Sequence, residues 1–216
     1  ICLHDLVFDI VPAKFHDKLR VIYQSAQPLK KERTLPKSNF HICLIANLRN
    51  VKDPLRGAYA LRSLPKSSKL RLVHLGKAET MAWAQKANTE MQINPRYIWR
   101  GQKAGWEVRE ELTRSHLMLI SSVNEGGANV VSEALVAQVP IIASRINGNI
   151  GLLGEDYLGY YAPGDEVALR RLLLKCEQDS KFVSRLLDHC RIRSAKFIIS
   201  EETKRWKQLL AETRSQ

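Results

Sequence analysis

The sequence predicts an α/β protein, with a Rossmann-like parallel sheet and helices on both of its faces. Two observations carry this prediction. From residue 41 onward, short apolar runs alternate with segments of helical periodicity. The apolar runs are also continuous, which is typical of parallel strands buried on both faces. Ligands bind such sheets beyond the carboxyl ends of the strands, so the residues that follow each strand are the most informative.

The strands and helices follow one another along the chain. We expect strands at residues 41–46, 70–75, 97–99, 117–120 and 140–143. We expect helices at residues 53–64, 79–91, 107–114 and 129–138, the first of them opened by Asp53 and Pro54. Residues 165–216 have the periodicity of further helices, and the last of these is amphipathic around Trp206, Leu209 and Leu210.

The first 40 residues differ from the rest of the chain. Residues 19–23 are predicted to form one strand, and residues 27–39 hold prolines and many charges, which is typical of a linker. The sequence begins at Ile1, without a starting Met or a basic leader. We therefore expect a fragment with three parts. These are the tail of a missing N-terminal domain plus linker (1–40), a ligand-binding domain (41–200) and a C-terminal helix (201–216).

The composition narrows the class of partner. Of the 216 residues 44% are hydrophobic and 26% charged, and the formal net charge is +12. This charge favours anionic partners, and a basic, solvated surface explains it equally well. The lysines and arginines form no dense tract, so no nucleic-acid partner is expected. No apolar run reaches the roughly 18 residues of a membrane span.

The cysteines and histidines bear on compartment and metal binding. The four cysteines form no Cys-x-x-Cys pair, and no histidine cluster has the spacing of a zinc site. We therefore expect no metal site, no disulfide framework and a cytoplasmic protein.

The most informative segment is residues 121–134, where a strand ends, two glycines turn and a helix begins. Glycines let a ligand approach the backbone, and the free amides and positive dipole end of the helix then face it, which suits a phosphate or diphosphate. Glu125 precedes this helix and Glu133 lies about one turn inside it. Carboxylates suit vicinal hydroxyls, so the segment predicts a site for a nucleotide sugar. Alternatively, the two glutamates only favour the start of the helix.

The spacing of Glu125 and Glu133 within EGGANVVSEALVAQVPIIAS resembles the signature of glycosyltransferase family 4. That family has the GT-B fold, in which two Rossmann-like domains face each other and the C-terminal one holds the sugar donor. The resemblance implies that Glu125 contacts the donor sugar and that Glu133 binds the ribose hydroxyls. It also implies that amides of the turn contact phosphate or sugar oxygens, at Gly126, Gly127, Ala128 and Asn129.

Two further segments resemble the same family. In residues 46–53, Lys52 matches a lysine that holds the diphosphate, whereas Asn47 stands where an arginine is usual and Arg49 is placed to compensate. Residues 97–101, which end at Gly101, resemble the strand end near which the family seats the base. Alternatively, the two aromatics of this strand belong to the core.

The match is closer to one group within the family. VIYQSA (21–26), LRNVKDPLR (48–56), EGGANVVSEA and ASRINGNIGLLGEDYLGYY (143–161) together resemble the selenosugar synthases. That group is implied to join a UDP-sugar to selenophosphate. Gly148 and Asn149, expected just before a short helix, would lie beside the donor. Gln138 replaces a glycine usual at this position, which indicates a change in a helix C-cap.

We therefore expect a glycosyltransferase donor domain that uses UDP-N-acetylglucosamine or UDP-glucose, with Glu125 and Lys52 as catalytic residues and no cofactor beyond the nucleotide-sugar co-substrate. An anionic acceptor such as selenophosphate is expected, and the chain without its N-terminal domain should bind donor without turnover. Three alternatives stay open. They are a family 4 enzyme with a sugar or lipid acceptor, a non-enzymatic basic module, and a sugar-nucleotide epimerase, for which only His74 is near a suitable position. The leucines beside His74 predict a core residue instead.

Overall fold

The computed structural model describes residues 1–214. Within them, six parallel strands form one sheet in the order β3-β2-β1-β4-β5-β6. The strands are β1 (Phe40–Ile45), β2 (Leu70–Leu75), β3 (Tyr97–Trp99), β4 (Leu117–Ile120), β5 (Ile141–Ser144) and β6 (Tyr160–Tyr161). The predicted Rossmann-like parallel sheet is confirmed, and β6 is a short strand that the sequence pattern did not reveal.

The strand register explains where a ligand crevice forms. β1 pairs with β2 from Phe40↔Leu70 to Ile45↔Leu75, and its other edge pairs with β4. The order of strands along the chain therefore reverses at β1, between β2 and β4. In doubly wound sheets, the loops beyond the carboxyl ends of the two strands at this point separate and leave a crevice.

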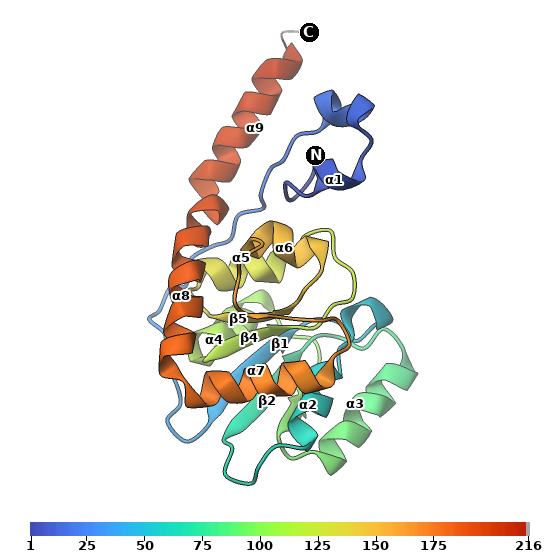
Figure 1. The fold of residues 1–216 in the computed structure, drawn as a ribbon, viewed down its shortest axis with the longest axis vertical. Helices are drawn as coiled ribbons and strands as arrows, with labels where there is room; N and C mark the ends of the chain where they lie inside the picture. Colours follow the sequence, from blue (N-terminus) through green and yellow to red (C-terminus); the bar gives the residue numbers. More distant parts are fainter. Residues whose placement is uncertain (215–216) are drawn as a thin grey trace.

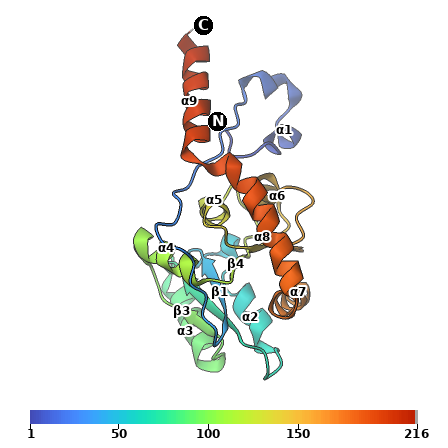
Figure 2. The same cartoon turned by 90° about the vertical axis from the view of Figure 1, so that its left-hand side faces the viewer.

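Helices cover both faces of the sheet, as predicted. Their bounds are α2 (Arg56–Arg62), α3 (Met81–Ile93), α4 (Gly105–Arg114), α5 (Asn129–Val136), α6 (Asn147–Leu153), α7 (Glu166–Gln178), α8 (Ser180–Ser194) and α9 (Ile199–Arg214). Figure 1 shows α5 and α6 above β5 and shows α2 and α3 beside β2, and Figure 2 shows α4 on one side and α2 and α7 on the other. None of the helices within residues 1–214 is both long and apolar enough to cross a membrane.

The ends of several helices differ from the prediction by a few residues. The helix predicted to open at Asp53 is α2, and it begins only at Arg56, because Asp53 adopts a left-handed conformation with φ of 40°. α3 starts two residues later than expected, since the Thr80 side chain caps it by accepting from the Trp83 amide at 3.3 Å. α5 ends at Val136, and Gln138 then turns the chain with φ of 54°. The sequence predicts a changed C-cap at Gln138, and the change is that a residue other than glycine adopts the left-handed conformation there.

The N-terminal segment does not join the sheet. It contains α1 (Val7–Ile10) and a 3-10 helix (Ala13–Lys18), and the strand predicted at residues 19–23 is wrong. Only a single bridge, between Cys2 and Val21, forms there, because no neighbouring strand of the described chain continues the pairing. Residues 27–39 form no helix or strand, as expected for a linker.

The N-terminal segment stands beside α9 instead, as Figures 1 and 2 both show. The Ser25 hydroxyl donates to Glu202 at 2.5 Å, and Arg20 pairs with Glu212 at 2.9 Å. These contacts join the two ends of the described chain next to α5 and α6.

Candidate functional site

An ion pair joins two loops at the carboxyl edge of the sheet. Lys52, which ends a 3-10 helix (Asn50–Lys52) after β1, pairs through its Nζ with Oε1 of Glu125, in the loop after β4. The Ser122 hydroxyl donates to the same Oε1 at 2.6 Å. The two charged side chains are only 15% and 12% exposed. Oε2 of Glu125 takes no part in these bonds, so the carboxylate keeps acceptor capacity for a ligand.

Further hydrogen bonds hold these two loops together. The Ser121 hydroxyl donates to the Lys52 carbonyl at 2.9 Å, and the Val123 amide donates to the Val51 carbonyl at 2.9 Å. A small hollow between the ends of β1 and β4 is lined in part by Lys52 and Glu125. Lys52 and Glu125 are therefore fixed by the backbone at the strand-order reversal and face a shared space.

The glycine turn leads into an uncapped helix. Gly127 has φ of 124°, a conformation that favours glycine, and a Cβ at Gly126 would meet nothing within 4 Å. α5 begins at Asn129 after Ala128, and no side chain of the described residues caps it. The Val131 amide donates to the Ala128 carbonyl at 2.9 Å, whereas the Asn129 and Val130 amides have no hydrogen-bond partner among residues 1–214, and together with the helix dipole they suit an anion.

Glu133 lies one turn inside α5. The Asn129 side-chain amide donates to its Oε1 at 3.3 Å. Burial raises the pKa of Glu133 above its ordinary value, and the nearby positive charge of Arg109 opposes that rise. A partly desolvated carboxylate with spare acceptor positions gains from hydroxyl donors, which is the behaviour expected of a diol-binding group.

The other residues predicted after β1 and β3 form a neighbouring group. Asn47 accepts from the Lys77 amide at 3.2 Å, and Arg49 lies 3.4 Å from Glu79, with its Nε buried and unpartnered within residues 1–214. Gly101 accepts from the Gly76 amide at 2.9 Å with φ of 69°. These residues lie at the same edge of the sheet. The side chains of Asn47 and Arg49 and the Gly101 carbonyl bond with the loop after β2, while the Arg49 carbonyl accepts from the Lys52 amide at 3.0 Å.

The Gly148–Asn149 pair is not placed as expected. Both residues lie inside α6 rather than before it, and the Asn149 side chain is fully buried. Its amide donates to the Ser144 carbonyl at 2.8 Å, whereas its Oδ1 has no partner among the described residues. Gly148 lies against the backbone carbonyl of Glu125. The pair therefore packs against the loop that carries Glu125 and limits where this loop can lie.

The sequence reasoning missed two N-terminal residues. Leu3 covers the glycine turn, since a Cβ at Gly127 would lie 2.8 Å from that of Leu3. His4 lies against Gly151 of α6, is only 6% exposed, and has an Nδ1 without a hydrogen-bond partner among the described residues. Burial lowers the pKa of His4, and Asp5 opposes this. No spacing pattern points to these residues, because they meet the site only through the tertiary fold.

His74 is a satisfied core residue, as its leucine neighbours predicted. It is fully buried, its Nε2 donates to the Ala46 carbonyl at 2.8 Å, and the Tyr97 hydroxyl donates to its Nδ1 at 2.9 Å. Burial lowers the pKa of His74 to about 4. With both nitrogens engaged, His74 is not free for the acid–base role that an epimerase would need.

Comparisons with known proteins bear on the family and the fold. A family model described as glycosyl transferases group 1 matches residues 25–191. Anabaena HepE, solved in complex with UDP and glucose, is 17% identical with a TM-score of 0.78, over 89% of this chain and 57% of that one. A Rickettsia africae glycosyltransferase is 14% identical with a TM-score of 0.83, over 97% and 62%. Sucrose-phosphate synthase from Thermosynechococcus elongatus is 17% identical with a TM-score of 0.74, over 91% and 53%.

These structures share the fold with this chain, and the chain spans between 53% and 62% of their lengths. A search of curated protein sequences finds no significant match.

Proposed function

The chain belongs to the group 1 glycosyl transferase family, and we propose that it is the donor-binding domain of an enzyme that transfers sugar from a UDP-sugar. One observation carries the proposal: the Lys52–Glu125 pair lies at the strand-order reversal, beside the uncapped start of α5. The HepE structures, solved with UDP and with UDP-glucose, support a uridine nucleotide as the donor.

Each part of the donor has a matching group on this chain. The diphosphate lies on the first amides of α5 and on Lys52, while Glu133 accepts hydrogen bonds from the ribose diol. The Oε2 of Glu125, which takes no part in the bonds to Lys52 and Ser122, accepts from hydroxyls of the donor sugar. The base lies near Gly101, at the end of β3.

The chemistry follows from these positions. An acceptor atom bonds to the anomeric carbon of the sugar as the bond from that carbon to the diphosphate breaks. Negative charge grows on the leaving oxygen, and the amides of α5 and the Lys52 ammonium stabilise it. Glu125 holds Lys52 in place before the donor arrives, so little reorganisation is needed.

The domain organisation belongs to the same proposal. Residues 1–40 are the tail of an N-terminal acceptor domain plus linker, and residues 41–200 bind the donor. The helix expected over 201–216 corresponds to α9, which the structure describes as far as Arg214, and residues 215–216 lie outside the described residues. The solved structures are longer than this chain, which supports a second domain that brings the acceptor. The chain alone then binds donor without turnover.

We propose selenophosphate as the acceptor and UDP-N-acetylglucosamine as the donor, on the segments that resemble the selenosugar synthases. A family 4 enzyme with a sugar or lipid acceptor is the alternative. Assays of the two-domain enzyme with selenophosphate, simple sugars and lipid acceptors distinguish these two proposals, because UDP should be released only in the presence of the acceptor class that the enzyme uses.

The test of the donor site is isothermal titration of the chain with UDP and UDP-N-acetylglucosamine. Lys52→Ala should weaken binding by roughly 1.5–3 kcal/mol, the usual contribution of a charged hydrogen bond. Lys66→Ala, an exposed lysine in the loop before β2, is the matched control and should leave binding unchanged. Absence of binding by the unmodified chain, or equal binding by Lys52→Ala, would contradict the proposal.

A further inference from the structure

A hollow of about 300 Å³ lies between the linker and the outer face of α4. Its lining includes Leu29, Lys30 and Lys31 from the linker and Trp106, Arg109 and Glu110 from α4. The α4 residues are spaced at i, i+3 and i+4, so they share one face of the helix, whereas the buried residues of α4 are Glu111 and Leu112. None of the residues proposed to hold the donor lines this hollow.

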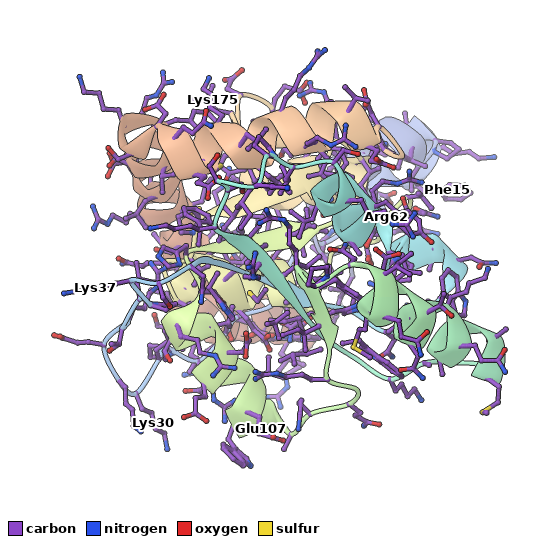
Figure 3. All side chains as sticks on the ribbon, turned by 90° about the horizontal axis from the view of Figure 1, so that it is seen from below. Phe15, Lys30, Lys37, Arg62, Glu107 and Lys175 are labelled. Carbon is purple, nitrogen blue, oxygen red and sulfur yellow. The ribbon has the colours of Figure 1, made fainter. Side chains whose placement is uncertain are left out.

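The walls of the hollow are held in place by hydrogen bonds. The Thr34 amide donates to the Thr113 carbonyl at 3.0 Å, and the Arg33 guanidinium donates to the Ser115 carbonyl at 2.5 Å and the Gln138 carbonyl at 2.6 Å. Figure 3 shows Lys30 on the linker and Glu107 on α4 projecting from the same side of the molecule. The linker is therefore fastened along α4, so the hollow is a feature of the folded domain.

The hollow carries unpaired positive charge. Among the described residues, Lys30, Lys31 and Arg109 make no ion pair, and Glu110 is the one acidic residue of the lining. Elsewhere on α4, by contrast, Glu107 pairs with Lys103 at 3.1 Å, and Glu111 pairs with Arg114. Arg109 also lies near enough to Glu133 to act on its pKa, but none of the three cations forms an ion pair within residues 1–214, and together around one concave space they attract an anion.

An exposed aromatic ring completes the hollow. Trp106 is 63% exposed, which is unusual for the largest side chain, and it makes no ring stacking or cation–π contact within residues 1–214. A flat, free indole beside cations suits a ligand that has both a ring to stack and phosphates to pair. Because the surface is concave rather than flat, it fits a small ligand.

We propose that this hollow is a second anion site, separate from the donor site, which binds a nucleotide. The ring of the nucleotide stacks on Trp106, and its phosphates contact Lys30, Lys31 and Arg109.

The test is titration of Lys52→Ala with ADP, because this variant weakens the donor site. UDP is left out, since its ring and phosphates would compete for the hollow as well. We expect ADP to bind with a stoichiometry of about one and Lys30→Glu/Lys31→Glu to weaken that binding at least tenfold, by removing two charge-assisted contacts. Lys66→Glu/Lys69→Glu makes the same charge change in another exposed loop and should leave ADP binding unchanged.

A second variant separates stacking from charge. Trp106→Leu should weaken ADP binding but leave the binding of inorganic pyrophosphate unchanged, since pyrophosphate has no ring. No binding of ADP to Lys52→Ala, or equal weakening by both charge-reversed pairs, would overturn the proposal. If UDP does not bind the unmodified chain, the donor-site proposal fails, whereas titration of Lys52→Ala with ADP still tests the hollow.

Discussion

Gly148 of α6 lies against the backbone carbonyl of Glu125, so that a Cβ atom at residue 148 would lie under 3 Å from that oxygen. Glu125 lies in the loop after β4, and Gly148 lies in α6, which follows the adjacent strand β5. α6 therefore sets how far the loop that carries Glu125 extends toward Lys52.

Gly148→Ala should displace this loop, because neither backbone can yield without moving its strand. We expect a loss of about 1–3 kcal/mol in the free energy of unfolding, which is typical of overpacking, and at least tenfold weaker UDP binding. Gly105→Ala is the matched control, since its Cβ would make only an ordinary contact, 3.7 Å from the Arg109 guanidinium. Urea denaturation and isothermal titration measure both effects, and equal behaviour of the two variants would refute the positioning role.

The proposed contact of Glu133 with the ribose predicts a preference among nucleotides. The unmodified chain should bind UDP more tightly than 2′-deoxy-UDP, because loss of the 2′-hydroxyl leaves a charged acceptor position unfilled. Glu133→Gln should weaken UDP binding and reduce that preference, whereas Glu32→Gln, in the exposed linker, should change neither. If the preference for UDP survives in Glu133→Gln, the ribose lies elsewhere.

His74 should make folding sensitive to acid. Burial lowers its pKa from 6.5 to about 4 in the folded chain, so between these values the unfolded chain binds the proton more readily. The contribution of neutral His74 to the free energy of unfolding is therefore fully present above pH 6.5. As the pH falls to about 4, this contribution decreases by up to about 3 kcal/mol. His74→Gln should lose correspondingly less unfolding free energy between pH 7.5 and pH 4 than the unmodified chain does. His16→Gln is the control, and an identical loss in all three proteins would contradict this account.

Gln138 occupies a backbone conformation that favours glycine, with φ of 54°. Gln138→Gly should raise the free energy of unfolding by about 1 kcal/mol, because it removes the steric penalty of a side chain in the left-handed region. Gln85→Gly, on an exposed position inside α3, should lower it by about 1 kcal/mol. Urea unfolding of the two variants would give shifts of opposite sign; a decrease for both would count against relief of strain at Gln138.

The fold was predictable from local patterns. The continuous apolar runs located β1 to β5 because parallel strands are buried on both faces, and the double glycine located the start of α5. Asp53 misled the prediction of α2, since its left-handed conformation delays the helix although Pro54 favours a helix start.

The site was less accessible to such reasoning. Lys52 and Glu125 are 73 residues apart, and only the family resemblance suggested that both serve one ligand. The packing of Gly148 on a carbonyl and of His4 on Gly151 depends on where whole elements lie, and neither contact has a signature in residue spacing.

The fastening of the N-terminal segment to α9 has a practical consequence for making this protein. Leu3 and His4 lie on the glycine turn and on α6, so an affinity tag joined to Ile1 would begin within a few residues of the proposed donor site. A tag following α9 would extend from a helix that has no buried residues. Ligand titrations should therefore use protein tagged at the C-terminal end, or protein from which an N-terminal tag has been cleaved without leaving extra residues.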